Sequence, residues 1–198
     1  MKYLLLCLTL SACPAVYGLS CGDAVSGNVT LTADLVCFNQ NGLTVSAANT
    51  IIQLNGHSIV CMGVGFAGSC QNPVGGPTGP APTGIWSTNF DNVTIQGPGK
   101  ITGFWYGILL DGGVGLVVQQ VIIDGPSVPL AQNLRGNAYG INLRNINCPN
   151  SNPLVPEHGT AANIAFNDIQ NQVADAGGDV DGLRVAQITC IPRVPGTP

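Results

Sequence analysis

The sequence predicts an all-β protein built as a parallel β-helix, a solenoid in which short strands stack from one coil of the chain to the next. Three observations predict it. First, the segments that begin at Gly84 and Gly107 share one pattern and lie 23 positions apart. Second, 27 glycines and only 8% charged residues favour strands and tight turns over helices. Third, aliphatic residues alternate within each segment, as on a strand with one buried face.

The glycine-led pattern marks five coils. It begins at Gly42, Gly84, Gly107, Gly140 and Gly182. One position after each glycine stand Leu43, Ile85, Ile108, Ile141 and Leu183, and three positions after it stand Val45, Ser87, Leu110, Leu143 and Val185. Both sets point to the same side of a strand, so stacked copies would form a continuous apolar core. We therefore expect about five to six coils, right-handed by the rule for connections between parallel strands.

Residues 1–18 have the pattern of a secretory signal peptide. Lys2 supplies the positive end, Tyr3 to Leu10 the apolar run, and Val16-Tyr17-Gly18 a cleavage site. An alternative stays open, because Leu10-Ser11-Ala12-Cys13 resembles the lipobox of bacterial lipoproteins, in which Cys13 carries a lipid anchor at the cell envelope. Secretion is favoured, since only 12 residues precede Cys13. Both alternatives place the mature protein outside the cytosol, in an extracellular or periplasmic space.

The mature chain keeps six cysteines, Cys21, Cys37, Cys61, Cys70, Cys148 and Cys190. An even number without a C-x-x-C pair favours disulfides over a zinc site. Proximity in sequence predicts that Cys21 pairs with Cys37 and Cys61 with Cys70. The third pairing, of Cys148 with Cys190, is left open.

Residues 19–198 are expected to form a single domain. Residues 19–41 would cap the open end of the core at the N-terminus, and the Pro-rich tail 191–198 would end the solenoid. Long intervals between opening glycines indicate inserted surface loops, which fall in Gly/Pro-rich or Pro-containing segments at 63–83, 126–136 and 148–160.

Three segments resemble a known group of proteins: Asn49-Thr50-Ile51-Ile52, Leu54-Asn55-Gly56-His57-Ser58-Ile59, and the run from Asn92 to Phe104. They are similar to the right-handed parallel β-helix repeat proteins of the pectin-lyase-like group, over about residues 40 to 190. The resemblance implies the fold, but the group spans lyases, glycoside hydrolases, epimerases and adhesins. In its catalytic members the outer strand face binds an acidic sugar, holds calcium or abstracts a proton. An enzyme of this kind would be a polysaccharide lyase or glycoside hydrolase, although polygalacturonase signatures are absent.

The outward positions of the opening strands form a candidate ligand-binding face, with Trp86, Asp111, Asn142, Arg144 and Arg184 as its candidate residues. Asp111 and Arg144 occupy equivalent positions on neighbouring coils, about 4.8 Å apart in backbone, and are expected to touch. A surface ion pair is the alternative to catalysis. Trp86 could stack on a sugar ring or pack under the loop 63–83.

Calcium is the candidate cofactor, because Asp175, Asp179 and Asp181 stand among glycines and carboxylates suit a hard cation. A solvated turn is the alternative. Neither His57 nor His158 completes a nucleophilic triad. Trp105 and Tyr106 are interpreted as packing at a turn.

Charge argues against a nucleic-acid partner, because the chain without its signal has 5 basic and 10 acidic residues. No segment after the signal is long and apolar enough to span a membrane. The predicted function is binding of carbohydrate, such as an acidic polysaccharide, with catalysis left open. The alternative is a non-catalytic structural or adhesive extracellular solenoid.

Overall fold

The computed structural model describes residues 18–63, 82–125, 138–147, 162–170 and 180–189. Throughout these residues the regular structure is β-strand, and the strands pair in parallel. The prediction of an all-β protein with parallel strands is therefore confirmed. The predicted signal (apart from Gly18), most of the three inserted loops and the tail lie outside the described residues.

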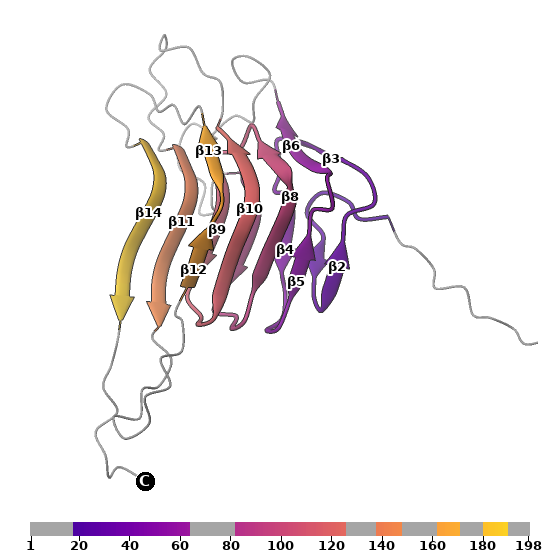
Figure 1. The fold of residues 1–198 in the computed structure, drawn as a ribbon. Helices are drawn as coiled ribbons and strands as arrows, with labels where there is room; N and C mark the ends of the chain where they lie inside the picture. The colour runs from indigo at the N-terminus through magenta and orange to yellow at the C-terminus, as the bar shows by residue number, and fades with distance from the viewer. Residues whose placement is uncertain (1–17, 64–81, 126–137, 148–161, 171–179, 190–198) are drawn as a thin grey trace, which may run out of the picture.

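The strands form two sheets (Figure 1). The six-stranded sheet contains, in order, β1 (Ala24–Val25), β4 (Leu43–Val45), β7 (Thr83–Thr88), β9 (Tyr106–Asp111), β11 (Ala138–Asn147) and β14 (Val180–Thr189). The eight-stranded sheet contains β2 (Asn28–Thr30), β3 (Leu35–Phe38), β5 (Ile51–Gln53), β6 (Ser58–Met62), β8 (Thr94–Thr102), β10 (Leu116–Asp124), β12 (Ala162–Ala165) and β13 (Asp168–Gln170).

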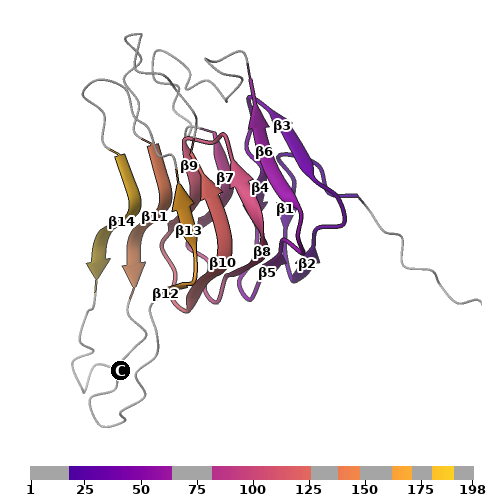
Figure 2. The ribbon, with the colours of Figure 1, turned by 45° about the horizontal axis from the view of Figure 1, so that its top comes forward.

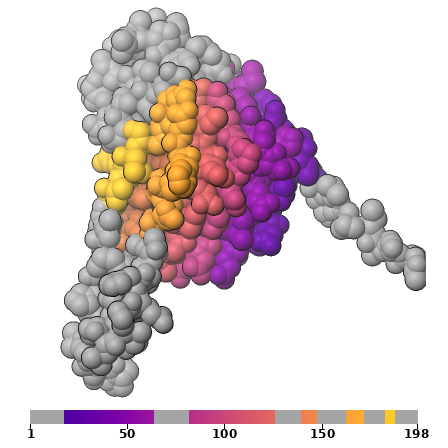
Figure 3. All heavy atoms as spheres, in the orientation of Figure 1, coloured from indigo at the N-terminus to yellow at the C-terminus, as the bar shows by residue number. Residues whose placement is uncertain are grey.

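The chain alternates between the two sheets, and each passage through a sheet adds one or two strands beside those of the passage before. Figure 2 shows this stacking from indigo β2 and β3 to yellow β14, and Figure 3 shows the same order as successive bands on the surface. The predicted cap, residues 19–41, contains β1, β2 and β3, which pair with β4, β5 and β6. The segment predicted as a cap is therefore already part of both sheets.

The predicted aliphatic ladder is present in the register of the six-stranded sheet. Leu43 pairs with Ile85, Ile85 with Ile108, Ile108 with Ile141, and Ile141 with Leu183. The first four of these side chains are fully buried, whereas Leu183 is 48% exposed. Leu183 belongs to β14, the last strand of the described sheet, so no further strand covers it there.

Glycine opens these strands because the next strand leaves no room for a side chain. A Cβ on Gly107 would lie 2.6 Å from the carbonyl oxygen of Gly140, and one on Gly140 would lie 2.5 Å from that of Gly182. Each would also collide with an isoleucine methyl group of the eight-stranded sheet, that of Ile123 or of Ile169. At Gly182, which ends the row, the nearest atom would be 3.6 Å away, an ordinary contact. The glycine row is thus a steric requirement of stacking.

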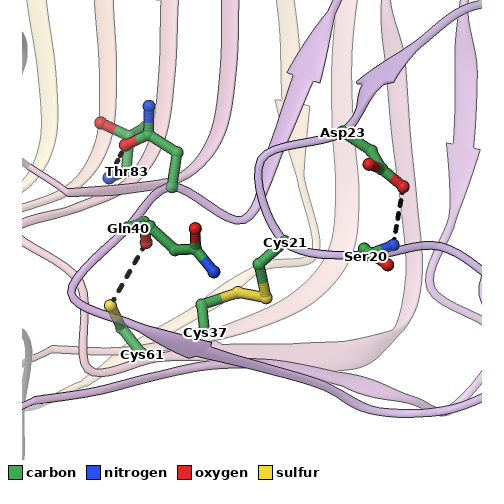
Figure 4. Close-up of a disulfide and its surroundings, with 8 residues drawn as sticks. Ser20, Cys21, Asp23, Cys37, Gln40, Cys61 and Thr83 are labelled. Atoms are coloured by element: carbon green, nitrogen blue, oxygen red, sulfur yellow. Dashed lines mark hydrogen bonds between the residues drawn. A yellow bond between two sulfur atoms is a disulfide. The ribbon is translucent and has the colours of Figure 1, made fainter.

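The disulfide predicted between Cys21 and Cys37 is present, with its Cα atoms 5.4 Å apart (Figure 4). It joins the segment before β1 to β3. Cys61 pairs with Cys37 in the strand register and is itself disulfide-bonded. Cys70, Cys148 and Cys190 lie outside the described residues, so their pairings stay predictions.

Candidate ligand-binding face

The outward positions of β7, β9, β11 and β14, taken from the strand register, lie in three rows across the six-stranded sheet. The row nearest the start of the strands contains Thr83, Tyr106, Tyr139 and Asp181; the second contains Trp86, Leu109, Asn142 and Arg184; the third contains Thr88, Asp111, Arg144 and Ala186. The second and third rows are those expected from the sequence. The first row was not expected.

The first row faces outward because the strand pattern changes at each glycine. A Cβ on Gly107 would point at the Ile123 side chain in the core, and the next residue, Ile108, also faces the core. Two consecutive inward positions turn the residue before the glycine, Tyr106, to the outer side. The sequence pattern was counted forward from each glycine, so it did not include the residue before the glycine.

Tyr106 and Tyr139 stack on this outer side, with ring centroids 5.3 Å apart and an angle of 20° between the rings. Tyr106 is the first residue of β9, so the interpretation of Tyr106 as turn packing is wrong. The neighbouring Trp105 is buried, in agreement with that interpretation. The signal that could have found the stack is a tyrosine directly before the glycine in two successive repeats.

An arginine from the next strand lies over each tyrosine. Arg144 of β11 donates a hydrogen bond from Nη2 to the Tyr106 hydroxyl (3.1 Å), and its guanidinium carbon is 5.4 Å from the ring centroid. Arg184 of β14 donates from Nη1 to the Tyr139 hydroxyl, and its guanidinium carbon is 5.0 Å from that ring. Cation–π contacts of this kind are worth about 0.5–2 kcal/mol. We call Tyr106, Tyr139, Asn142, Arg144 and Arg184 the Tyr–Arg face.

The expected contact between Asp111 and Arg144 does not form, although the register places the two residues side by side. The Asp111 carboxylate instead accepts a hydrogen bond from Asn145 Nδ2 at 2.7 Å. Within the described residues, Arg144 is turned toward Tyr106 and forms no ion pair. The surface ion pair considered as the alternative to catalysis is therefore wrong, and the reason is that each partner has a closer polar neighbour.

Asn142 lies in the middle of the face, and its burial was not expected. It pairs with Leu109 of β9 on one side and with Arg184 of β14 on the other. Its side chain has no exposed area, and neither Nδ2 nor Oδ1 has a hydrogen-bond partner among the protein groups described. Outward orientation predicted exposure to solvent, whereas the neighbours Leu109 and Tyr139 are also buried, at 2% and 1% exposed.

The five candidate residues are thus only partly brought together. Asn142, Arg144 and Arg184 belong to the Tyr–Arg face. Trp86 is partly exposed on β7, next to Leu109 in the second row, and Asp111 is partly exposed on β9 beside Arg144. Trp86 and Asp111 therefore lie at the margin of the face.

The candidate calcium ligands are not placed. Asp175 and Asp179 lie outside the described residues, and of Asp181 only the backbone, paired with Tyr139, is described. The described side chains include no group of three or more His, Cys, Asp or Glu arranged to hold a metal.

His57, which completes no nucleophilic triad, lies beside a carboxylate. Its Nδ1 is 3.4 Å from Asp34 Oδ1, which also accepts a hydrogen bond from the Ser58 amide.

No protein-family model, curated protein or solved structure matches this chain. None of the described segments is a helix that could cross a bilayer. Fold and face together define an all-β protein of parallel strands that carries a row of stacked tyrosines and arginines on the outside of one sheet.

Proposed function

We propose that this chain is a secreted right-handed parallel β-helix of the pectin-lyase-like type, and that it binds carbohydrate through the Tyr–Arg face. The solenoid is supported by the regular alternation between two parallel sheets and by the glycine row, which requires closely stacked backbones. Secretion is supported by the signal pattern and by the disulfide between Cys21 and Cys37.

The observation that carries the carbohydrate proposal is the pair of guanidinium groups held over stacked tyrosines. Guanidinium groups bind carboxylates through charge-assisted hydrogen bonds, and tyrosine offers an apolar ring with a polar end. Tyr106 and Tyr139 fix the orientation of Arg144 and Arg184, so little side-chain freedom is lost when a ligand binds. An acidic sugar presents both groups that this face suits, a carboxylate and an apolar ring surface.

Turnover is not part of the proposal. Glycoside hydrolysis normally uses two carboxylates on opposite sides of the bond that is cut. Among the side chains described on the three rows, Asp111 is the one carboxylate, and it is bonded to Asn145. The face is therefore proposed to bind a polysaccharide without hydrolysing it.

A glycan array, run with and without calcium, tests this proposal, together with lyase and hydrolase assays on acidic polysaccharides. We expect binding to uronate-containing glycans, no product release, and weaker binding as salt rises, because exposed charge interactions are screened. Binding that is confined to neutral glycans, or absent from the whole array, would contradict the proposal.

A structural or adhesive role is the second candidate, and one observation favours it. Leu183 and Val185 occupy core positions of β14 but are 48% and 47% exposed, whereas their partners Ile141 and Leu143 are buried. An exposed apolar strand at the end of a sheet can pair with another chain. Sedimentation analysis over a range of concentrations tests this role: a monomer at all concentrations excludes assembly through this edge.

A further inference from the structure

Within the described part of the chain, Asn142 carries the buried side-chain amide whose nitrogen and oxygen both lack a hydrogen-bond partner. Buried polar groups are nearly always hydrogen-bonded, and an unpaired one destabilises the folded protein. The same row position on β9 holds Leu109, which is buried without that penalty. A leucine would therefore suit stability better than an asparagine at this position.

The residues around Asn142 indicate a function for its amide. Arg184 is its partner on the next strand, and Arg144 stands two residues further along the same strand, on the same side. Both arginines are partly exposed and bonded to tyrosine hydroxyls. The unpaired amide thus lies among the groups proposed to bind the sugar, and positions that violate local rules of stability are commonly functional.

We propose that Asn142 binds a vicinal diol of the sugar, and thereby selects glycans whose hydroxyls are unsubstituted. This inference rests on the proposed carbohydrate function and deepens it. An amide offers a donor and an acceptor side by side, so Nδ2 donates to one hydroxyl oxygen while the adjacent hydroxyl donates to Oδ1. A carboxylate would satisfy only Nδ2 and would place a negative charge against Oδ1. The sugar carboxylate therefore goes to Arg144 and Arg184, and the diol to Asn142.

Burial of Asn142 adds a requirement for binding. Because its side chain has no exposed area, a sugar reaches it only after a covering group moves aside. An acyl group on the diol removes the hydroxyl donor and adds volume in this confined position, so both effects disfavour a substituted sugar.

Calorimetric titration with two probes of equal charge tests the inference: trigalacturonic acid, and the same trisaccharide acetylated on its 2- and 3-hydroxyls. We expect the unmodified protein to bind the free form about tenfold more tightly, as loss of one or two good hydrogen bonds implies. The Asn142→Leu variant should bind both forms within about twofold of each other. It should also melt a few degrees higher, because the unpaired amide is gone.

The outcomes separate the inference from the function on which it rests. Equal binding of the two forms by the unmodified protein overturns the role of Asn142 and leaves carbohydrate binding intact. A preference that survives in Asn142→Leu, and in the smaller Asn142→Ala variant, overturns it as well. If the unmodified protein binds neither form, the proposed function fails, and the inference fails with it.

Discussion

The guanidinium of Arg144 lies over the ring of Tyr106, one strand away in the six-stranded sheet, and donates a 3.1 Å hydrogen bond to its hydroxyl. The same relationship recurs one strand further on, between Arg184 and Tyr139. Two contacts of one kind on adjacent parallel strands give the outer face two cations, Arg144 and Arg184, which lie in neighbouring rows of the sheet. The tyrosines on which they lie, Tyr106 and Tyr139, are paired in the strand register.

The coupling free energy between Arg144 and each neighbour should be larger for Tyr106, which it contacts, than for Asp111, which it does not. In double-mutant cycles of stability, we expect Arg144→Gln and Tyr106→Phe to couple by about 0.5–1.5 kcal/mol, because the two side chains share a hydrogen bond and a ring contact. Arg144→Gln and Asp111→Asn should couple less, since Asp111 is bonded to Asn145. Urea unfolding of the single and double variants measures both values, and a larger coupling to Asp111 would refute the described arrangement.

Replacing a glycine of the row by alanine should destabilise the protein, except at Gly182, the last glycine of the row. Gly107→Ala should destabilise the protein by about 1–3 kcal/mol, because the new Cβ collides with the Gly140 carbonyl and an Ile123 methyl group. Gly182→Ala, at the equivalent position of β14, meets only ordinary contacts and should change stability by no more than about 1 kcal/mol. Urea denaturation compares the pair; equal losses would contradict a steric origin of the glycine pattern.

A charge in the aliphatic ladder should prevent folding where the ladder is covered. Ile108→Asp places an unpaired carboxylate at a fully buried position, so the variant should fail to fold. Leu183→Asp, in the same ladder but 48% exposed, should remain folded. Circular dichroism of the two purified variants distinguishes them, and a folded Ile108→Asp variant would show that this ladder is not the core.

Removal of the disulfide at the start of the sheets should lower stability substantially. The bond between Cys21 and Cys37 closes a loop of 16 residues, and a loop of this size restricts the unfolded chain by about 3 kcal/mol. The double variant Cys21→Ser, Cys37→Ser should therefore lose about that much free energy of unfolding, measured in urea.

Peptide mapping of the unmodified protein without reduction should recover Cys61 joined to Cys70, and free thiols at both would disprove that predicted pair.

The core could be predicted from the sequence and the outer face only in part. Leu43, Ile85, Ile108 and Ile141 are spaced by the strand period from a glycine, so their register followed directly from the repeat. Tyr106 was missed because the alternation changes at Gly107, where two successive positions face the core. A periodic pattern counted forward from the glycine contains no information about the residue before it.

Side-chain choices on the face could not be predicted at all. Asp111 and Arg144 are neighbours in register, yet they do not bond to each other. Arg144 donates to the Tyr106 hydroxyl, and Asp111 accepts from the Asn145 amide. Burial of Asn142 likewise depends on three-dimensional neighbours that a strand period does not identify. Adjacent register positions therefore establish which residues can meet, and local hydrogen-bond partners decide which of them do.

The affinity of the purified protein for trigalacturonic acid, measured by calorimetry alongside two charge-matched variants, shows whether the Tyr–Arg face binds an acidic sugar. Arg144→Gln removes one positive charge from the Tyr–Arg face, and Lys100→Gln removes one from β8 in the other sheet, where Lys100 pairs with Asp124 at 2.6 Å. If the sugar binds at the Tyr–Arg face, Arg144→Gln weakens binding about tenfold, as expected for a charge-assisted hydrogen bond, while Lys100→Gln changes it less than about twofold. Equal weakening by both variants, or no effect of Arg144→Gln in a folded protein, would contradict binding at the Tyr–Arg face.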